Sequence, residues 1–411
     1  MVPLHYDNGI PSNRIDGHRR SILVVISHYL PGYRAGGPVR SVEALVDRLG
    51  SQFEIRIICL DRDLGDSRPY EGIETGIWLQ SGKAEIMYLS KKEISFTRLK
   101  KTIHAVNPDV LYLNTFFSVR FTLFPLLSAR LVHKKPATVL AVRGSLSPGA
   151  LGLKPIKKQL FLRICKASGI FRLVTWQATS EDEQKHIKTL FPRAHTVLAP
   201  NLSVLTSNRG RQQHMPEKRT GHLRVIFLSR ISPKKNLAFA IDQLSRLSSS
   251  IEFTIAGPIE DEVYWQVCLR KIESLPGNIH VRFLGPVHHD DVDQILRSHH
   301  LYILPTLSEN FGHSIIEAFG AGLVVLISDQ TPWHYLERLN VGWDIPLNDG
   351  KAWERALQRC CDLDDVEFKG MSESSLRALS SFLDQTESER ANSELFTGAI
   401  RVGSRRGSSI R

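Results

Sequence analysis

The chain has 411 residues, and its 42% of hydrophobic and 23% of charged residues are typical of a globular protein with two or three domains, which excludes extensive disorder. The 53 Lys and Arg exceed the 42 Asp and Glu by 11, so we expect an anionic partner such as nucleic acid, membrane lipid or a phosphorylated substrate. No segment reaches the roughly 20 apolar residues of a membrane span, and the five cysteines lack metal-ligand spacing, so a cytoplasmic protein is expected.

Short β-branched runs alternate with helical patterns from residue 21 onward, after a polar extension at residues 1–20. A helix is expected from Val39 to Leu49, with Gly50 as its C-terminal cap. Buried strands are expected at residues 22–27, 53–60, 110–113 and 138–142. This alternation predicts a Rossmann-like, parallel-sheet N-terminal domain over residues 21–205.

A polar stretch without periodicity, residues 206–222, is interpreted as a linker before a second series of strands and helices. The strands of this series are expected at residues 224–228, 253–256, 281–284 and 301–304. We therefore expect a second Rossmann-like domain over residues 223–350, C-terminal helices over residues 351–395 and a basic, disordered tail over residues 396–411. The predicted fold class is α/β, with two Rossmann-like parallel-sheet domains facing a cleft.

Residues 305–322 carry the most informative motif of the second domain. A strand ends at Leu304, and Ser314 is expected to cap the helix that follows. The peptide N–H groups near Phe311 and Gly312 then remain free at the helix N-terminus, where they can bind phosphate oxygens. Ligands bind at this edge of open α/β sheets, so the motif predicts a binding site for a phosphorylated ligand.

Two glutamates of this motif, Glu309 in the loop and Glu317 in the helix, have the E-x7-E spacing and are expected to face the crevice. With the surrounding Glu-Asn-Phe-Gly and Gly-Ala-Gly, the motif resembles the family-4 retaining glycosyltransferases of the GT-B fold, also called glycosyl transferases group 1. Three further segments are similar to motifs that the family has in the same order. Residues 228–237 resemble its diphosphate clamp, and residues 255–258 and 283–287 resemble two of its glycine-containing strand ends.

The N-terminal half resembles the same family. Gly36 and Gly37 stand in a segment similar to its glycine loop, where absent side chains let the backbone approach a pyrophosphate across the cleft. Residues 143–151 resemble a motif of the polysaccharide-assembly subset, although Arg143 could equally pair with an acidic residue in the cleft. One departure is at Asn114, since many relatives place a histidine after the Pro-Asp-Val strand.

The resemblance implies retaining transfer of a sugar from a nucleoside-diphosphate sugar to a lipid-linked or saccharide acceptor, in exopolysaccharide, lipopolysaccharide or other glycan assembly. The catalytic residues that it implies are Arg230, Lys235 and Glu309. The donor-binding residues that it implies are Gly36, Gly37, Gly257, Asn310, Phe311, Gly312 and Glu317, and the acceptor-side residues are Asn114 and Arg143. No metal or other cofactor is implied, because cationic side chains neutralise the leaving diphosphate. A same-fold sugar-nucleotide hydrolase or epimerase and a catalytically inactive basic adaptor remain alternatives.

Two other polar clusters are interpreted as structural. Asp61-Arg62-Asp63 has the Asp-x-Asp spacing of metal sites in the other glycosyltransferase fold, GT-A, but is interpreted as a solvated loop. Residues 288–291, His-His-Asp-Asp, are expected to cap a helix. No GxGxxG opens a helix after a strand, so a redox dinucleotide fold is not supported.

Basic residues from Lys91 to Lys101 alternate with apolar ones, and further lysines surround the Arg143 motif. They form either ordinary solvated faces or a surface that docks on anionic lipid, which would make the protein peripheral on the cytoplasmic face of the membrane. No aromatic platform or groove-reading helix accompanies the charge, so nucleic acid is not expected as a partner.

Overall fold

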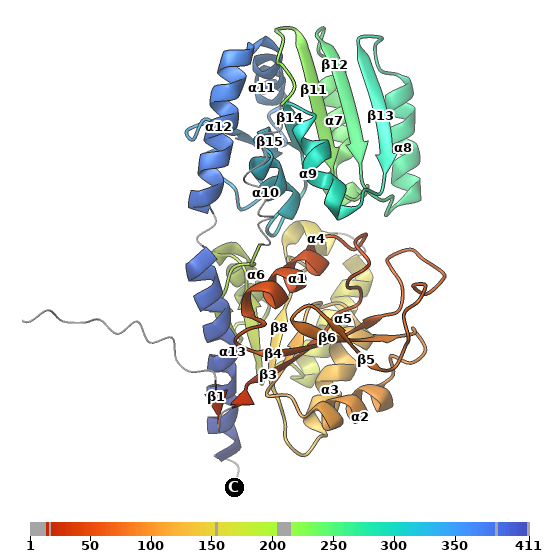
Figure 1. Cartoon of the computed structure of the whole chain (residues 1–411), viewed down its shortest axis with the longest axis vertical. Coiled ribbons are helices and arrows are strands. Elements are labelled where there is room, and N and C mark those ends of the chain that lie inside the picture. The colour runs from red at the N-terminus through yellow and green to blue at the C-terminus, as the bar shows by residue number, and fades with distance from the viewer. Residues whose placement is uncertain (1–13, 16–17, 153–154, 204–214, 383–384, 409–411) are drawn as a thin grey trace, which may run out of the picture.

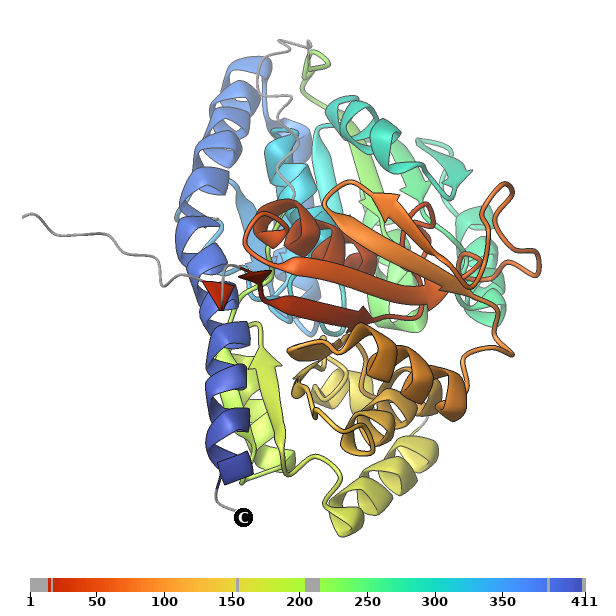
Figure 2. The same cartoon turned by 60° about the horizontal axis from the view of Figure 1, so that its bottom comes forward.

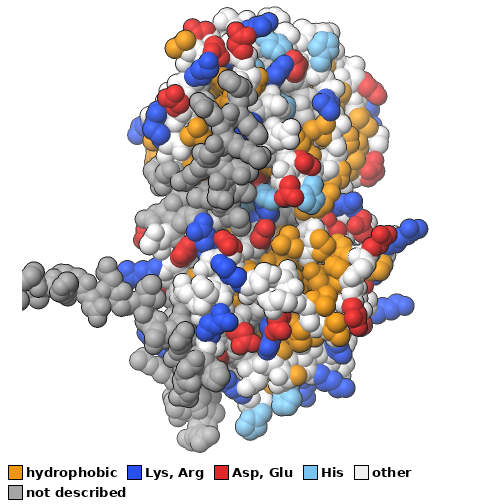
Figure 3. Space-filling view, in the orientation of Figure 1, with side chains coloured by type: hydrophobic (Ala, Val, Ile, Leu, Met, Phe, Trp, Pro, Cys, Tyr) orange, Lys and Arg blue, Asp and Glu red, His pale blue; other side chains and the backbone are white. Residues whose placement is uncertain are grey.

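The computed structural model describes residues 14–15, 18–152, 155–203, 215–382 and 385–408. It consists of two α/β domains, one above the other in Figure 1, and the surface narrows between them in Figure 3. Each domain is built on a largely or wholly parallel sheet that is covered by helices. The prediction of two parallel-sheet domains is therefore confirmed.

The N-terminal domain has an eight-stranded sheet in the order β10-β9-β8-β7-β3-β4-β6-β5. Its strands are parallel except for β5, which pairs antiparallel with β6 at one edge. The strands are β3 (Ser21–Val25), β4 (Glu54–Leu60), β5 (Trp78–Ser81), β6 (Ala84–Leu89), β7 (Val110–Leu113), β8 (Ala137–Ala141), β9 (Val174–Ala178) and β10 (His195–Leu198). A separate short ladder joins β1 (Arg14–Ile15) and β2 (His18–Arg19).

Helices cover both faces of this sheet, so its central strands are buried on both sides and read as continuous apolar runs. Side chains alternate between two cores: Leu23 and Val25 belong to one, and Ile22 and Val24 to the other. The helices of the domain are α1 (Gly37–Leu49), α2 (Phe96–Val106), the π-helix η1 (Val119–Leu123), α3 (Phe124–Arg130), α4 (Pro148–Gly152), α5 (Pro155–Ser168) and α6 (Glu181–Leu190). The predicted helix over Val39–Leu49 and its cap at Gly50 are confirmed, and the helix begins two residues earlier.

The C-terminal domain has a six-stranded, fully parallel sheet in the order β13-β12-β11-β14-β15-β16. Its strands are β11 (His222–Leu228), β12 (Ser250–Ala256), β13 (Ile279–Gly285), β14 (Leu301–Leu304), β15 (Val324–Ser328) and β16 (Gly342–Ile345). Its helices are the 3₁₀-helix η2 (Pro233–Lys235), α7 (Leu237–Leu244), α8 (Glu262–Glu273), α9 (His289–Arg297), α10 (His313–Gly320), α11 (Gly350–Asp362) and α12 (Asp365–Phe382). One continuous core joins this sheet to α11 and α12.

The last helix, α13 (Gln385–Ser408), returns to the N-terminal domain, where it packs against β7, β8 and α1 (Figure 1). The ring of Phe396 lies 5.8 Å from that of Phe53 and 5.2 Å from that of Tyr112. The prediction of a disordered tail over residues 396–411 is therefore wrong as far as residue 408. The prediction was based on the serine-rich composition and did not take account of an apolar stripe at helical spacing. Leu395, Phe396 and Ala399 belong to this stripe and are buried.

The predicted linker over residues 206–222 falls partly on residues 204–214, which lie outside the described part of the chain. The remainder is packed on the C-terminal domain and ends in β11. Lys218 is 2% exposed, and its Nζ donates to the carbonyl oxygens of Cys361 and Leu363 at 3.0 and 2.9 Å. Among the described helices, none combines the length and the apolar character needed to cross a bilayer.

Candidate functional site

A cavity of about 260 Å³ lies between the two domains, near the carboxyl ends of the central strands of both sheets. The N-terminal domain contributes the loop before α1, the start of α1 and Arg143. The C-terminal domain contributes the turns after β11 and β12, the start of α9, and the loop and helix of the E-x7-E motif. Of the predicted site residues, all except Asn114 line this cavity.

The N-terminus of α10 faces the cavity at Gly312. This residue has φ = 79°, a left-handed conformation that suits glycine, and a Cβ here would come within 2.7 Å of Ile315 Cδ1 and 3.2 Å of Glu309 Cγ. The prediction that Ser314 caps the helix is wrong, because its hydroxyl lies 2.7 Å from the Tyr302 hydroxyl instead. The helix has no side-chain cap, so its first N–H groups are left for an anionic ligand.

The N-terminus of α1 faces the same cavity from the other domain. Gly36 has φ = 68° and begins this helix without a side-chain cap, and its carbonyl accepts from the amides of Val39 and Arg40. A Cβ on Gly37 would lie 3.5 Å from Cδ2 of His313 on α10, so a larger side chain would fill the space between the two helices. Two helix N-termini, each with a partial positive charge, therefore converge on one cavity.

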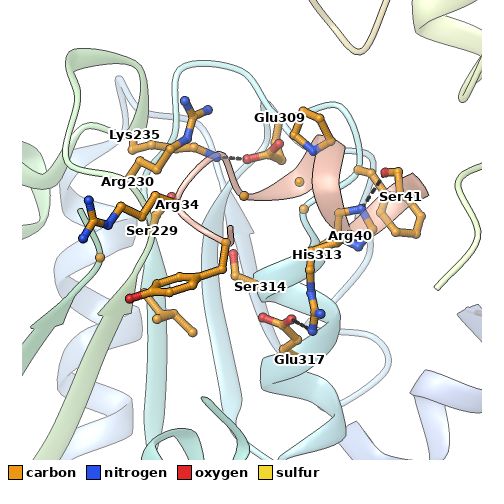
Figure 4. Close-up of a pocket in the computed structure, with 18 of the residues that line it drawn as sticks. Arg34, Arg40, Ser41, Ser229, Arg230, Lys235, Glu309, His313, Ser314 and Glu317 are labelled. Atoms are coloured by element: carbon orange, nitrogen blue, oxygen red, sulfur yellow. Dashed lines mark hydrogen bonds and ion pairs between the residues drawn. The ribbon is translucent and has the colours of Figure 1, made fainter. Parts of the chain in front are cut away.

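Lys235 and Glu309 form an ion pair at this cavity (Figure 4). Lys235 follows β11 in η2, and the loop of Glu309 is fixed by two backbone bonds of 2.8 Å, from Leu307 to the Lys234 carbonyl and from Glu309 to the Gln330 carbonyl. Burial raises the pKa of Glu309, but Lys235 and Lys234 together lower it to about 2. Glu309 is therefore an ionised carboxylate at neutral pH.

Arg230 stands at the cavity wall after β11, and its Nη1 donates to Glu260 at 2.9 Å. Gly257 stands opposite, after β12, with φ = 138°. A Cβ on Gly257 would come within 2.0 Å of the carbonyl oxygen of the residue before Arg230, so the close approach of the two strand ends requires glycine. Figure 4 shows Arg34 and Arg230 on the same side of the site as Lys235, which makes this side suited to an anion.

Glu317 lies one turn inside α10, and Arg40 of α1 reaches it across the cleft, with 3.6 Å between Arg40 Nη2 and Glu317 Oε1 (Figure 4). Arg40 also donates to Glu43 at 2.5 Å and contacts His289. Burial raises the pKa of Glu317 to about 7, although Arg40 opposes the increase. Sequence analysis did not identify Arg40 as a site residue, and its position three residues after Gly37 is the signal that could have done so.

His313, the first residue of α10, is another cavity residue that sequence analysis did not single out. One ring nitrogen, Nε2, lies 2.9 Å from the hydroxyl of Ser41 on α1. Burial lowers the pKa of His313 to about 3, and Arg143 and Arg40 add to this effect, so the ring is neutral at pH 7. Its place directly after the glycine of Glu-Asn-Phe-Gly was the available signal.

Arg143 reaches the cavity, whereas Asn114 lies behind it and is 3% exposed. The guanidinium donates to Asn114 Oδ1 at 2.9 Å, to the Tyr112 hydroxyl at 2.8 Å and to the side chain of Asn201. These partners are uncharged, and among the residues that the structure describes Arg143 forms no ion pair with an acidic side chain. The two predicted acceptor-side residues are in contact, and Asn114 orients the arginine.

Asn310 and Phe311 connect the loop of the E-x7-E motif to its surroundings. The side-chain amide of Asn310 donates across the cleft to the Thr179 hydroxyl at 2.7 Å. Gly144 faces the same asparagine, and a Cβ on Gly144 would come within 2.8 Å of Asn310 Cβ. The ring of Phe311 packs edge-on against His313, with 4.8 Å between centroids. These contacts fix the backbone that leads into α10.

The interpretation of Asp61-Arg62-Asp63 as a solvated loop is wrong, because Asp61 and Asp63 are 4% and 5% exposed. Asp63 accepts hydrogen bonds from the amides of Tyr33 at 2.9 Å and Arg34 at 3.1 Å, while Asp61 pairs with Arg62 at 2.8 Å. The Asp63 carboxylate thereby holds the loop that leads to the start of α1. Local sequence could not show this, because the two amides belong to a loop about 30 residues upstream.

The expectation that residues 288–291 cap a helix is confirmed, since His288 is the N-cap of α9. Within the part of the chain that the structure describes, no group of three His, Cys, Asp or Glu side chains is placed to hold a metal ion. The five cysteines are buried and form no disulfide.

A family model and several solved structures match this chain. Residues 209–366 match the family model described as Glycosyl transferases group 1. No curated protein matches the chain. The matched residues contain Arg230, Lys235, Glu309 and Glu317, on which the resemblance was based.

Three solved structures share the architecture over nearly the whole chain. Sucrose-phosphate synthase from Thermosynechococcus elongatus aligns with a TM-score of 0.67 and 15% identity, over 93% of this chain and 100% of that chain. Anabaena HepE in complex with UDP and glucose aligns with a TM-score of 0.65 and 14% identity, over 92% and 100%. An E. coli trehalose-6-phosphate structure bound with UDP-2-fluoro glucose aligns with a TM-score of 0.63 and 10% identity, over 92% and 99%. The chain therefore has the GT-B fold, and its C-terminal domain matches the family model of glycosyl transferases group 1.

Proposed function

We propose that this protein is a glycosyltransferase that moves a sugar from a nucleoside-diphosphate sugar to a hydroxyl acceptor with retention of anomeric configuration. The observation that supports this most is the convergence of two helix N-termini, Arg230 and Lys235 on one cavity that also contains Glu309 and Glu317. Such a cavity offers hydrogen-bond donors to a diphosphate and carboxylates to sugar hydroxyls.

In the proposed pose, the diphosphate lies between the N-termini of α1 and α10, beside Arg230 and Lys235. Glu317 accepts hydrogen bonds from the ribose hydroxyls, and Glu309 accepts them from the donor sugar. Negative charge develops on the diphosphate as its bond to the anomeric carbon breaks, so positive groups already in place stabilise the transition state more than the ground state. The ion pairs of the two cations with Glu260 and Glu309 support this preorganisation.

The acceptor is proposed to enter beside Arg143. Asn114 holds that arginine and stands where many relatives have a histidine, but a neutral amide cannot take a proton from the acceptor hydroxyl. A leaving diphosphate oxygen is therefore proposed to take this proton while the acceptor oxygen bonds to the anomeric carbon. Both events then occur on the same face of the sugar, which accounts for retention.

A UDP-sugar is the first donor to test, because the Anabaena structure contains UDP and the E. coli structure contains UDP-2-fluoro glucose. The acceptor is proposed to be lipid-linked or a saccharide, within the polysaccharide-assembly subset that makes exopolysaccharide, lipopolysaccharide or other glycans. A location at the cytoplasmic face of the membrane stays a prediction.

The proposal is tested by a thermal-shift screen of UDP-, GDP- and ADP-sugars, followed by product analysis. A ligand at 100 times its dissociation constant adds about 2.7 kcal/mol to the free energy of unfolding, so the correct donor raises Tm clearly. With that donor and a panel of acceptors, NMR of the product is expected to show the anomeric configuration of the donor. An inverted product would contradict retention. Free sugar released without an acceptor would indicate a hydrolase. An isomerised donor would indicate an epimerase, and binding without turnover would indicate an inactive adaptor.

The absence of a metal requirement is proposed on the same grounds. Donor turnover is expected to survive EDTA, because Arg230, Lys235 and the helix N-termini neutralise the diphosphate. Loss of activity in EDTA with recovery in Mn²⁺ would contradict this expectation and would make Asp61 and Asp63 candidate metal ligands.

A further inference from the structure

The excess positive charge of this chain is concentrated in one segment. Residues 110–180 contain 11 Lys and Arg and no Asp or Glu, so this segment accounts for the whole net charge of +11. The same segment contains seven of the 17 large hydrophobic side chains that are exposed among the described residues. Cations and exposed apolar side chains therefore occur together in one part of the N-terminal domain.

Helix α5 has an apolar stripe on its outer face. Ile156, Leu160 and Ile164 are 82%, 59% and 58% exposed, and their spacing of four residues places them on one side of the helix. The opposite side of the helix packs on the rest of the domain, since Leu162 and Cys165 are buried in the core. The outer stripe thus has no part in folding this domain.

Two cations border this stripe. Counted at 100° per residue, Lys157 and Arg163 fall on either side of Ile156, Leu160 and Ile164, and both are exposed. No acidic residue occurs in α5. An apolar stripe between basic side chains is the pattern of helices that lie in the interface of an anionic bilayer.

The surroundings of α5 extend this surface. Arg130, at the end of α3, donates to the carbonyl of Ile170 just beyond α5, which holds the two helix ends together. Leu131 next to Arg130 is 59% exposed, and Leu173 is 61% exposed. Figure 2 shows α5, the yellow helix at the bottom, at the outer edge of the molecule and away from the C-terminal domain.

The stretch from Lys91 to Lys101, which the sequence suggested for membrane binding, lacks such a stripe. Its apolar residues Ile94 and Leu99 are 1% and 0% exposed and belong to the core. The lysines of this stretch are exposed, but none of its own apolar side chains is among the exposed large hydrophobic residues. It therefore serves as an internal control of similar charge.

We propose that α5 docks this protein on an anionic membrane surface, with Ile156, Leu160 and Ile164 inserted below the lipid headgroups and with Lys157 and Arg163 against the headgroup phosphates. The charge of the segment selects an anionic bilayer over a second copy of this equally basic chain. The proposal concerns binding alone, so it is independent of the proposed sugar transfer.

The first test is sedimentation of the full chain with vesicles of phosphatidylcholine, with and without phosphatidylglycerol. The native protein is expected to bind the anionic vesicles and to dissociate at high salt. The triple variant Ile156→Gln, Leu160→Gln, Ile164→Gln should reduce the partition coefficient on the order of tenfold or more. The control Val366→Gln changes a side chain of the C-terminal domain that is 78% exposed and should bind as the native protein does. Unchanged binding by the triple variant would overturn the proposal.

The second test compares two charge reversals of equal size. Lys157→Glu with Arg163→Glu should abolish most binding to anionic vesicles, whereas Lys100→Glu with Lys101→Glu in α2 should reduce it much less. Equal losses would show that net charge attracts the protein without a docking helix, which would refute the role of α5.

The third test reports on α5 itself. Because the native cysteines are buried, Leu160→Cys can be labelled with an environment-sensitive fluorophore, with Val366→Cys as the control. A blue shift at position 160 on anionic vesicles, absent at position 366, is expected. A blue shift that appears without vesicles as protein concentration rises, together with a dimer in sedimentation, would show that a second copy covers this surface and would overturn the proposal.

Discussion

The charged side chains of the proposed donor site are paired with oppositely charged neighbours in the structure. The pairs are Lys235 with Glu309, Arg230 with Glu260 and Arg40 with Glu317. A substitution at one of these residues therefore removes a ligand contact and also frees a partner. For this reason the variants below are compared in sets.

We predict that the residues of the donor site divide into a binding group and a rate group. Ribose contacts do not change along the reaction, so Glu317→Ala should weaken donor binding by roughly 1.5 to 3 kcal/mol with a smaller effect on kcat. Attraction to the diphosphate grows as charge develops, so Arg230→Ala and Lys235→Ala should each lower kcat on the order of a hundredfold. Steady-state kcat and donor KM for the three variants are the measurement.

The control for these variants is Lys271→Ala, which removes a surface ion pair with Asp242 of 2.7 Å far from the cavity and should leave both constants unchanged. If Glu317→Ala lost kcat alone while the two cation variants lost binding alone, the positions of ribose and diphosphate would be inverted.

Donor binding should also depend on pH through Glu317. Burial raises the pKa of this carboxyl to about 7, so in the free protein it is largely protonated below that pH. Ribose hydroxyls donate best to the ionised form, so affinity should fall as the pH decreases below 7 and should level off above it. The neighbouring His289 and His313 have pKa values lowered to about 4 and 3, so they do not titrate in this range.

Isothermal titration with a UDP-sugar between pH 5.5 and 8.5, roughly, measures this dependence, because a diphosphate esterified at both ends does not itself titrate there. The variant Glu317→Gln should bind more weakly at pH 8 and show a flat profile. A native profile that is equally flat would show that Glu317 does not meet the ligand.

Most of the predicted donor-site residues lie close together in sequence, within residues 228–237 and 305–322, and the cavity brings them together with Gly36, Gly37 and Gly257. Arg40 and Asp63 could not be predicted, because each acts through a partner that sequence spacing does not reveal. The partner of Arg40 is Glu317 in the other domain, and Asp63 binds backbone amides of a loop before α1.

At the scale of elements, strands with continuous apolar runs were predictable. The predicted strands at residues 110–113 and 301–304 have the observed bounds of β7 and β14. The strands β5 and β10 were missed because they lie at sheet edges and are half exposed, so neither has an unbroken apolar pattern. The strands β6, β9, β15 and β16 were not predicted either, although β9 and β15 are buried over their whole length. The part of helix α13 after residue 395 was missed because its apolar residues face a domain nearly two hundred residues earlier in the chain.

Helix α13 should stabilise the N-terminal domain although it follows the C-terminal domain in sequence. Phe396→Ala removes a fully buried ring from the core that contains Phe53 and Tyr112, and it should cost about 3 to 5 kcal/mol. Hydrogen exchange followed by mass spectrometry should then show faster exchange in β3 and β7, with β11 and β14 unchanged.

The matched variant for this experiment is Leu379→Ala on α12, the preceding helix, which packs on α10 and β15. It should accelerate exchange in the C-terminal domain instead. If both variants accelerated exchange equally in both domains, the two domains would unfold as a single cooperative unit. Helix α13 would then not stabilise the N-terminal domain in particular.

At the scale of the whole molecule, the two domains touch through side chains that surround the cavity. The contacts across the cleft include Ser41 with His313 at 2.9 Å, Asn310 with Thr179 at 2.7 Å and Ser147 with Ser308 at 2.9 Å. These contacts are polar, as is common in interfaces that allow relative domain motion. A donor site assembled from both domains therefore depends on how often the domains are closed.

Ser41→Ala should shift this balance toward the open form. It removes a hydrogen bond worth about 1 kcal/mol, so we expect donor affinity to fall roughly fivefold and the radius of gyration from small-angle scattering to increase. Ser51→Ala, at an exposed position in the same domain, is the control and should change neither quantity. An unchanged radius with lower affinity would mean that Ser41 acts on the ligand site directly.

A ribosome making this protein completes the first domain last. The strands β3 to β10 are translated by residue 198, but the face that Phe396 covers stays open until α13 emerges. At 5 to 20 residues per second, the roughly 190 intervening residues take about 10 to 40 seconds. The C-terminal domain has its full core once α12 is translated, before α13 exists. We therefore expect the second domain to reach its native state on the ribosome while the first is still an unfinished substrate for chaperones, the reverse of their order along the messenger RNA.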